Sequence, residues 1–190
     1  IEIKSLLEIV IVVLTLKLIV SRWQPPLQES LQAIISICLG TGIALAMNPT
    51  FSGWYGPAMN THRSPFAGRN FEYYSEDGLL AGKIAAEVVS GAASKGLYAY
   101  IKHFALNDQE TWRTTALCTW ADEQTIREIY LKPFEICVKE AKYEIDYIAD
   151  ENGNHATKEM NATTAVMSSF NRIGTTWAGG NKNLMTNVLR

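Results

Sequence analysis

The sequence contains little cysteine and little histidine, with three of each among 190 residues. No Cys-x-x-Cys pair occurs, and the odd number of widely separated thiols (Cys38, Cys118 and Cys137) does not fit a disulfide framework. We therefore expect free, mostly buried thiols. No two histidines have the His-x-x-x-His spacing of a helical zinc site, so we expect no metal. No Gly-x-Gly-x-x-Gly follows a strand pattern, which disfavours a dinucleotide site, and we expect no cofactor.

Neither sign of charge is in large excess. The chain has 17 basic and 19 acidic residues and a net charge of −2, with the two signs mixed along the sequence. Proteins that bind nucleic acid through one face concentrate lysine and arginine there. We therefore expect no nucleic-acid partner.

Long apolar runs are also missing. The longest one, residues 9–20, is interrupted by Lys17 and is shorter than the roughly 20 residues of a membrane span. We expect a buried strand or an apolar helix there and no contact with a membrane. A signal-peptide core is the alternative, but no basic segment precedes the run and no small-residue cleavage site follows it. Free cysteines suit a reducing compartment, so we expect a cytoplasmic location.

Residues 1–50 form an apolar N-terminal segment that contains no aspartate. Pro25-Pro26 should end any element that precedes it. Residues 27–47 could form an apolar helix, which Gly40 and Gly42 would weaken. The pattern changes after this point, so we divide the chain into residues 1–50 and 51–190.

The second part of the chain alternates strand and helix patterns. Residues 54–60 predict a short strand that runs into a loop. Residues 78–94 predict an amphipathic helix that begins after Asp77, and residues 97–104 predict a buried strand. Together these three elements form one βαβ step.

A second such step follows. Asp122-Glu123 should begin a helix that Pro133 kinks or breaks. The polar, turn-rich residues 143–164 predict a surface excursion, residues 164–171 a third strand, and residues after Asn181 a last helix. Repeated steps of this kind predict an α/β fold with a parallel sheet, either closed as a barrel or doubly wound.

Lys102 and His103 come where the central strand turns from apolar to polar. In α/β proteins the carboxyl ends of parallel strands hold ligands. An ammonium and an imidazole side by side suit a ligand that is dense in hydroxyl groups. The alternative is that both side chains only cap the strand and reach solvent.

Several stretches of the chain resemble glycoside hydrolase family 3. They include Gly68-Arg69-Asn70-Phe71-Glu72, Lys102-His103-Phe104, Asn107-Asp108-Gln109-Glu110 and Met167-Ser168-Ser169-Phe170-Asn171, in the family's order. The resemblance extends from about residue 52 to residue 190. It implies that the predicted sheet is part of a (β/α)8 TIM-like barrel, and that the complete protein is a retaining β-glucosidase-type hydrolase acting on β-glucosides or oligosaccharides.

The resemblance also implies roles for particular residues. Arg69, Lys102 and His103 match the family's ligands of the sugar in the −1 subsite. Phe170 stands where many members have tyrosine, which keeps an apolar platform but loses a hydroxyl group. The N-acetylglucosaminidase branch of the family has a second histidine where this chain has Ala105-Leu106-Asn107, which favours the β-glucosidase branch.

The carboxylates within the matched part do not make an obvious catalytic pair. Glu72 lies three residues from Arg69 and should form a structural ion pair with it. Asp108 and Glu110 could face the pocket. We expect Asp108, with its neighbour Asn107, to orient Lys102, His103 or the loop backbone and not to attack the sugar.

The resemblance places the nucleophilic aspartate and the acid/base glutamate beyond Arg190, so this chain alone should be inactive and should need the rest of its polypeptide. The alternative function is a non-catalytic carbohydrate-binding or scaffold module derived from the barrel. In the family, an Asp-Gly-Pro loop should lie within residues 1–50. Its absence means either that this segment has diverged or that it is a misread, frame-shifted one.

Overall fold

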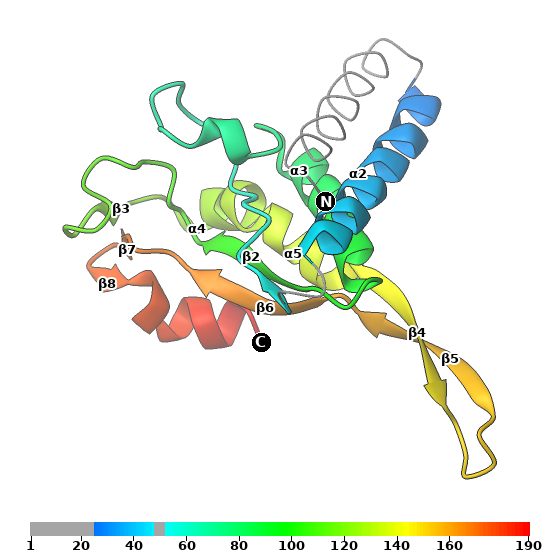
Figure 1. The fold of residues 1–190 in the computed structure, drawn as a ribbon. Coiled ribbons are helices and arrows are strands. Elements are labelled where there is room, and N and C mark those ends of the chain that lie inside the picture. The colour runs from blue at the N-terminus through cyan, green and yellow to red at the C-terminus, as the bar shows by residue number, and fades with distance from the viewer. Residues whose placement is uncertain (1–24, 48–51) are drawn as a thin grey trace.

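A computed structural model of the chain describes residues 25–47 and 52–190. Its centre is a parallel sheet of three strands in the order β1 (Gly53–Trp54), β2 (Tyr98–Phe104) and β6 (Thr163–Ser168). The register pairs Tyr100 with Ala165 and Ile101 with Val166. The predicted strands around residues 54, 97–104 and 164–171 are therefore confirmed, and they lie next to one another (Figure 1). The buried strand or apolar helix predicted for residues 9–20 lies outside the described residues.

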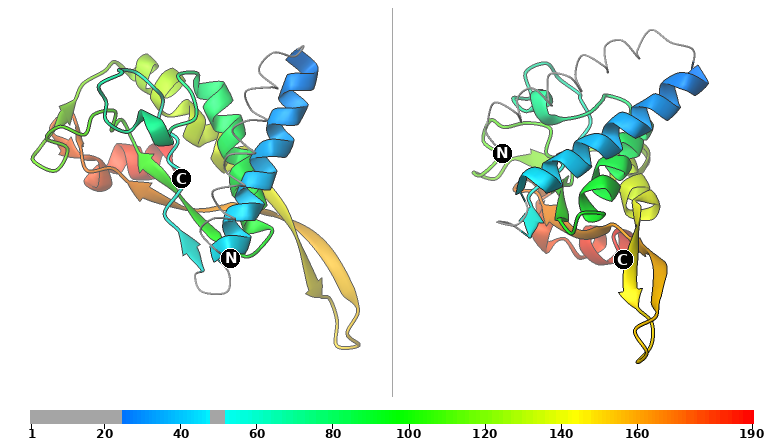
Figure 2. Two further views of the ribbon diagram at one scale, coloured as in Figure 1. Left: turned by 45° about the horizontal axis from the view of Figure 1, so that its top comes forward. Right: turned by 45° about the vertical axis from the view of Figure 1, so that its right-hand side comes forward.

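Three helices, α2 (Pro25–Met47), α3 (Gly78–Ala93) and α5 (Lys132–Glu140), lie beside the sheet, and α3 contacts both β2 and the other two helices. The two turned views in Figure 2 show α2 running alongside α3, which in turn packs against α5. A Cβ atom on Gly40 would lie 1.9 Å from the carbonyl oxygen of Val88. Gly40 therefore permits the close approach of α2 to α3, a role that the expected weakening of the helix did not anticipate.

The helix boundaries follow local signals in the sequence. Asp77 caps α3 by accepting hydrogen bonds from the backbone N–H groups of Leu79 at 2.7 Å and Leu80 at 3.0 Å. In the next helical region, α4 (Glu123–Thr125) and the π-helical η2 (Ile126–Tyr130) precede α5. Pro133, near the start of α5, has no N–H to donate, and the predicted break is found just before it.

The core lies between β2 and the helices. Met59, Val89 and Ile101 are fully buried there. The rings of Phe104 and Phe134 meet edge to face with their centroids 5.2 Å apart, which ties the end of β2 to α5.

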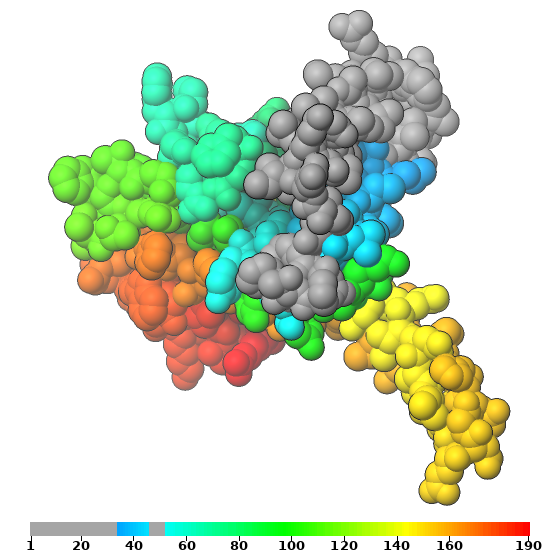
Figure 3. Space-filling view, viewed as in Figure 1, coloured from blue at the N-terminus to red at the C-terminus, as the bar shows by residue number. Residues whose placement is uncertain are grey.

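Residues 142–161 form an antiparallel hairpin of β4 (Lys142–Ile148) and β5 (His155–Asn161). The hairpin projects away from the body of the molecule, as Figures 1 and 3 show. The predicted surface excursion is confirmed, but it is more regular than its composition indicated. Seven consecutive pairs, from Lys142–Asn161 to Ile148–His155, hold its strands together.

A second small sheet lies near the carboxyl ends of β2 and β6. It consists of β3 (Cys118–Thr119), β7 (Arg172–Ile173) and β8 (Thr176–Trp177), and it is followed by the 3-10 turn η3 (Ala178–Gly180) and the π-helical η4 (Asn183–Val188). The helix predicted after Asn181 is therefore present as η4. A short 3-10 turn, η1 (Asn70–Glu72), lies in the loop before α3.

The cysteines are free, as predicted, but the expectation that they are mostly buried is wrong. Only Cys137 is buried, whereas Cys38 and Cys118 are exposed. Burial raises the pKa of the Cys137 thiol to about 12. Cys118 lies on the short strand β3 at the molecular surface, where no layer covers it.

Residues 25–47 and 52–190 contain neither a membrane-spanning helix nor a metal-binding cluster. None of the helices there is both long enough and apolar enough to cross a bilayer. The same residues contain no group of three or more His, Cys, Asp or Glu side chains that could hold a metal ion.

Candidate functional site

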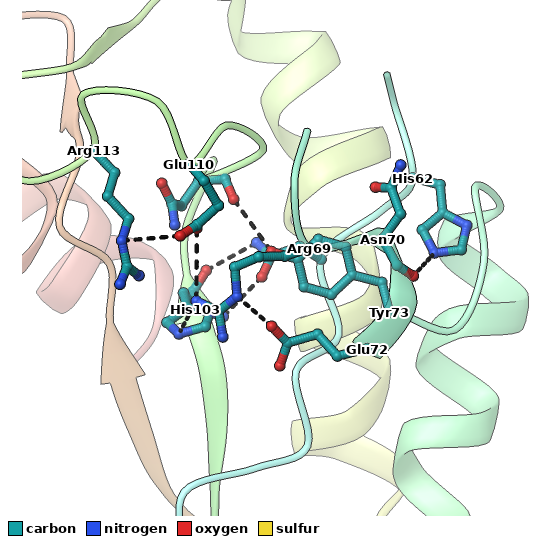
Figure 4. Close-up of polar contacts among 10 residues, drawn as sticks. His62, Arg69, Asn70, Glu72, Tyr73, His103, Glu110 and Arg113 are labelled. Atoms are coloured by element: carbon teal, nitrogen blue, oxygen red, sulfur yellow. Dashed lines mark hydrogen bonds and ion pairs between the residues drawn. The ribbon is translucent and has the colours of Figure 1, made fainter. Parts of the chain in front are cut away.

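The candidate site lies at the carboxyl end of β2, where Lys102 and His103 are brought next to Arg69. Arg69 comes from the loop between β1 and α3 and directly precedes η1. Figure 4 shows the side chains of Arg69 and His103 pointing toward each other, with Glu72 and Glu110 beside them. The structure therefore brings together the three residues that the sequence suggested as sugar ligands.

The backbone of Lys102 and His103 is fixed by the segment that follows β1. Met59 donates its backbone N–H to the Lys102 carbonyl oxygen at 2.8 Å, and Lys102 donates to Pro57 at 3.0 Å. The buried side chain of Asn60 forms two hydrogen bonds with the His103 backbone. Its Oδ1 accepts from the His103 N–H at 2.8 Å, and its Nδ2 donates to the His103 carbonyl oxygen at 3.0 Å.

Sequence reasoning missed Asn60. Its only local signal is that it is a polar residue at the end of the predicted strand 54–60, at the same edge of the sheet as Lys102 and His103. These two hydrogen bonds matter because both buried backbone groups of His103 rely on the Asn60 side chain for a partner.

The His103 ring is neutral and accepts a hydrogen bond from Arg69. The Arg69 Nη1 atom lies 3.1 Å from His103 Nε2, and a guanidinium can only donate. Burial lowers the pKa of His103 to about 3, and the charges of Arg69, Lys102 and Arg113 add to this effect. The remaining proton is therefore on Nδ1, a buried atom that has no hydrogen-bond partner among the residues described.

Arg69 also contacts two carboxylates. Its Nε atom donates to Glu72 Oε1, which is the ion pair that the three-residue spacing predicts. Its Nη1 atom lies 3.7 Å from Glu110 Oε1, within ion-pair range but too far for a hydrogen bond. Glu110, which the sequence placed near the pocket without a partner, thus faces Arg69.

Of Arg69, Lys102 and His103, Lys102 has the side chain with the fewest polar contacts. Within the described part of the chain, its ammonium group has no hydrogen bond and no ion pair. Burial lowers its pKa, the nearby charge of Glu72 raises it, and that of Arg69 lowers it further, with a net decrease. All of its N–H donors remain available to a ligand.

The contacts expected of Asp108 are not found. Over residues 25–47 and 52–190, its carboxylate forms no hydrogen bond with Lys102, His103 or the loop backbone, and its buried Oδ1 has no partner. Its charge interacts instead with Arg63 and Tyr73, both on the loop before α3. Burial raises the pKa of Asp108 to about 7, so this carboxyl group is partly protonated at neutral pH.

Asn107 lies beside Asp108 and is fully buried. Its backbone carbonyl oxygen accepts a long hydrogen bond of 3.5 Å from the Tyr73 hydroxyl. Both side-chain polar atoms of Asn107 lack a hydrogen-bond partner among the described residues, so the expected orienting contacts to Lys102 or His103 are absent here too.

The ends of β2 and β6 are tied together by buried polar side chains. Ser169 Oγ donates to the Ala105 carbonyl oxygen at 2.9 Å, and Asn171 Nδ2 donates to the Leu106 carbonyl oxygen at 3.1 Å. Between these two buried residues, Phe170 is 55% exposed. The Arg113 guanidinium lies over this ring, 5.1 Å from its centroid. Arg113, like Asn60, was not identified from the sequence.

A pocket among the described residues lies elsewhere. It is an apolar crevice between α5 and η4, lined by Leu131, Phe134, Val138, Val188 and Leu189. Arg127 and Lys139 also line it, but both are exposed and already paired, with Glu123 and Glu135, so the crevice offers few free donors to a hydroxyl-rich ligand. The cluster around Arg69 and Lys102 remains the candidate site on chemical grounds.

The chain is similar to a protein family, to curated proteins and to solved structures. Residues 42–149 match the family described as the glycosyl hydrolase family 3 N terminal domain. The chain is 53% identical over 107 residues to Beta-glucosidase A of Butyrivibrio fibrisolvens, a match that covers 55% of this chain and 13% of that protein. It is 37% identical over 173 residues to a Beta-glucosidase of Rhizobium radiobacter, covering 90% of this chain and 17% of that protein.

Among solved structures, beta-glucosidase 3B from Thermotoga neapolitana in complex with alpha-D-glucose matches with a TM-score of 0.66 and 36% sequence identity. The match covers 85% of this chain and 19% of that one. The chain thus spans less than a fifth of each of these three proteins. The structural likeness decides between the two α/β arrangements left open by the sequence, and it confirms a partial TIM-like barrel.

Proposed function

Because the chain belongs to glycosyl hydrolase family 3, as part of the N-terminal domain, we propose that the complete protein cleaves β-glucosides. In this proposal the chain supplies residues that bind the sugar on the non-reducing side of the cleaved bond. The proposal concerns the complete protein because the chain covers only 13% to 17% of the two β-glucosidases compared above.

The observation that carries the proposal is the set of free donors at the end of β2. Lys102 has an uncommitted ammonium group, and His103 has a buried Nδ1–H without a partner among the described residues. A sugar presents several neutral hydroxyl groups that can accept from both. A hydrogen bond from the charged Lys102 is worth about 1.5–3 kcal/mol and one from the neutral His103 ring about 0.5–1.5 kcal/mol, so the two together would bind and orient the ring.

The charges around the donors favour a neutral ligand over a phosphate. Arg69 is paired with Glu72 and faces Glu110, and Glu110 also pairs with Arg113. These two carboxylates offset most of the positive charge of the site. A phosphate site would instead keep its arginines free for bidentate contacts. The glucose in the Thermotoga neapolitana complex is a ligand of the kind that this arrangement suits.

Phe170 would form an apolar wall of the same site. Its exposed ring follows β6 on the edge of the sheet where Lys102 and His103 end β2. The C–H face of a pyranose ring can pack on such a surface, while its hydroxyl groups turn toward the donors.

The catalytic pair would come from the rest of the polypeptide. Retaining glycosidases need two carboxyl groups about 5–5.5 Å apart, one of them ionised as the nucleophile. In the described residues, Glu72 and Glu110 are engaged by Arg69 and Arg113, and burial raises the pKa of Asp108 to about 7. None of these three is suited to attack the sugar.

The test uses the complete protein that contains this chain, with nitrophenyl β-glucoside as substrate. Lys102→Ala and His103→Ala should each lower kcat/KM at least about tenfold, because each removes a donor to the ring. Lys83→Ala is the matched control, since Lys83 is an exposed lysine on α3 paired with Glu140. Near-wild-type kinetics in both site variants would refute the assignment. Glucose binding without any turnover would favour a non-catalytic carbohydrate-binding module.

A further inference from the structure

Glu110 lies between two arginines, Arg69 and Arg113. Its Oε2 atom is 3.1 Å from Arg113 Nε, and its Oε1 atom is 3.7 Å from Arg69 Nη1. Figure 4 shows the Glu110 carboxylate between the two guanidinium groups. Glu110 is thus drawn toward Arg113 and held just beyond hydrogen-bond distance of Arg69.

The position of Glu110 bears directly on His103. The Arg69 atom that faces Glu110 is Nη1, and the same atom contacts His103 Nε2 at 3.1 Å. Nη1 carries two N–H groups fixed in the plane of the guanidinium, so closer pairing with Glu110 would turn that plane and shift the N–H that His103 accepts. Oε1 of Glu110 has no hydrogen-bond partner among the described residues, so a small movement toward Arg69 would satisfy it.

Arg113 has a second contact, with the face of Phe170. Its guanidinium centre lies 5.1 Å from the ring centroid, in the range of a cation–π interaction. Arg113 therefore links the loop that holds Glu110 to the aromatic side chain that follows β6. The side chains of Arg113 and Glu110 are each 29% exposed, so neither ion pair is fully screened by solvent.

The backbone places these groups firmly. The Glu110 N–H donates to the Ala67 carbonyl oxygen at 3.1 Å, and the Arg113 N–H donates to the Glu110 carbonyl oxygen at 3.2 Å. Gly68, with a φ of +91°, lets the loop before α3 pass close to Glu110, because a Cβ atom there would lie 3.1 Å from the Glu110 side chain. The loop carrying Arg69 and the loop carrying Arg113 thus meet at Glu110.

We propose that Arg113 is a positioning residue for β-glucoside cleavage, which keeps Glu110 off Arg69 and holds the Phe170 ring in place. The inference rests on the proposed function of the site. Without Arg113, the Glu110 carboxylate would turn to Arg69 and draw Nη1 away from His103. The donors Lys102 and His103 and the Phe170 ring would then no longer keep fixed positions relative to one another.

The charge competition predicts a rescue that loss of packing would not give. In the complete protein, Arg113→Met should lower kcat/KM on nitrophenyl β-glucoside about tenfold, an effect of the size expected for one mispositioned charged donor. Adding Glu110→Gln removes the charge that pulls on Arg69, so the double variant should recover at least about threefold over Arg113→Met alone. Arg113→Lys should lie between, since an ammonium holds Glu110 but does not lie flat on Phe170.

Arg127→Met is the matched control, because Arg127 forms an exposed ion pair with Glu123 away from these loops. The proposal is overturned if Arg113→Met behaves like this control, or if the double variant is no better than Arg113→Met. If Arg113→Met does not fold, the double variant is compared with Arg113→Lys instead. The proposal then predicts that kcat/KM of the double variant is at least equal to that of Arg113→Lys, and a lower value overturns it.

A crystal structure of the Arg113→Met variant separates this inference from the proposed function. The expected result is a hydrogen bond between Glu110 and Arg69 and loss of the contact between Arg69 Nη1 and His103 Nε2. A retained contact near 3.1 Å would overturn the inference even in an active enzyme. An inactive wild-type protein whose variant shows the shift would instead refute the proposed function and leave the positioning effect intact.

Discussion

Removal of the Asn60 side chain should damage the site more than its size suggests. Asn60→Ala deletes two hydrogen bonds, one at 2.8 Å from the His103 N–H and one at 3.0 Å to the His103 carbonyl oxygen. Both backbone groups are buried, and a buried group left without a partner costs about 1–3 kcal/mol. Allowing for water that enters the gap, we expect a loss of about 2–4 kcal/mol in the free energy of the folded site.

This loss of free energy should also lower activity, because the two hydrogen bonds from Asn60 hold the backbone of His103 in place. In the complete protein, Asn60→Ala should lower kcat/KM on nitrophenyl β-glucoside at least about tenfold. Asn60→Asp is the sharper variant. Its carboxylate can still accept from the His103 N–H, but it cannot donate to the carbonyl oxygen and would repel it. We therefore expect Asn60→Asp to be at least as impaired as Asn60→Ala.

Asn187→Ala serves as the control, since Asn187 is exposed on η4 and its side chain donates to Asn183 Oδ1 one turn away. Surface changes of this kind usually alter stability by less than about 0.5 kcal/mol. Thermal unfolding of each variant shows whether a loss of activity follows from a loss of fold. If Asn60→Ala and Asn60→Asp both keep kcat/KM within about twofold of wild type, the hydrogen bonds from Asn60 do not position His103 for function.

Two further predictions concern single side chains in the complete protein. Burial raises the folded-state pKa of Asp108 to about 7 from an ordinary 3.8, so the folded state binds this proton more tightly than the unfolded state and stability falls as pH rises between these values. Asp108→Asn should therefore raise the unfolding temperature more at pH 8 than at pH 4, and an equal change at both would contradict the burial of this carboxyl group. Phe170→Ala should raise KM at least about threefold by removing an apolar wall, whereas Phe170→Tyr should keep or improve it. Phe66→Ala, at an exposed phenylalanine on the neighbouring loop, is the control, and a KM shift of the same size there would count against a role for Phe170.

The parts of the fold that local chemistry determines were predictable from the sequence. Asp77 caps α3, and the break before Pro133 follows from its missing N–H. The apolar-to-polar change at Lys102 and His103 marked the end of β2 correctly. That the sheet is part of a TIM-like barrel was not predictable from periodicity, because a doubly wound sheet has the same local pattern.

Where the sequence failed, contacts between distant residues decide the outcome. Residues 142–161 look polar and turn-rich, yet pairing along two seven-residue strands makes them a hairpin. The exposure of Cys118 depends on the small sheet it joins, which no local pattern revealed. Asp108 was expected to orient Lys102, His103 or the loop backbone, but its charge interacts with Arg63 and Tyr73 on another loop.

The same distinction applies within the candidate site. The residue types at the end of β2 identify possible donors, but partners far away in the sequence decide which donors are free. Arg69 lies 34 residues from His103 and takes the lone pair of its Nε2, which leaves the proton on Nδ1. Asn60 lies 43 residues from His103 and holds its backbone. Lys102 forms no hydrogen bond with either of these residues through its side chain and keeps its donors for a ligand. The proposed preference of the site for hydroxyl groups therefore depends on the fold around a dipeptide and not on the dipeptide alone.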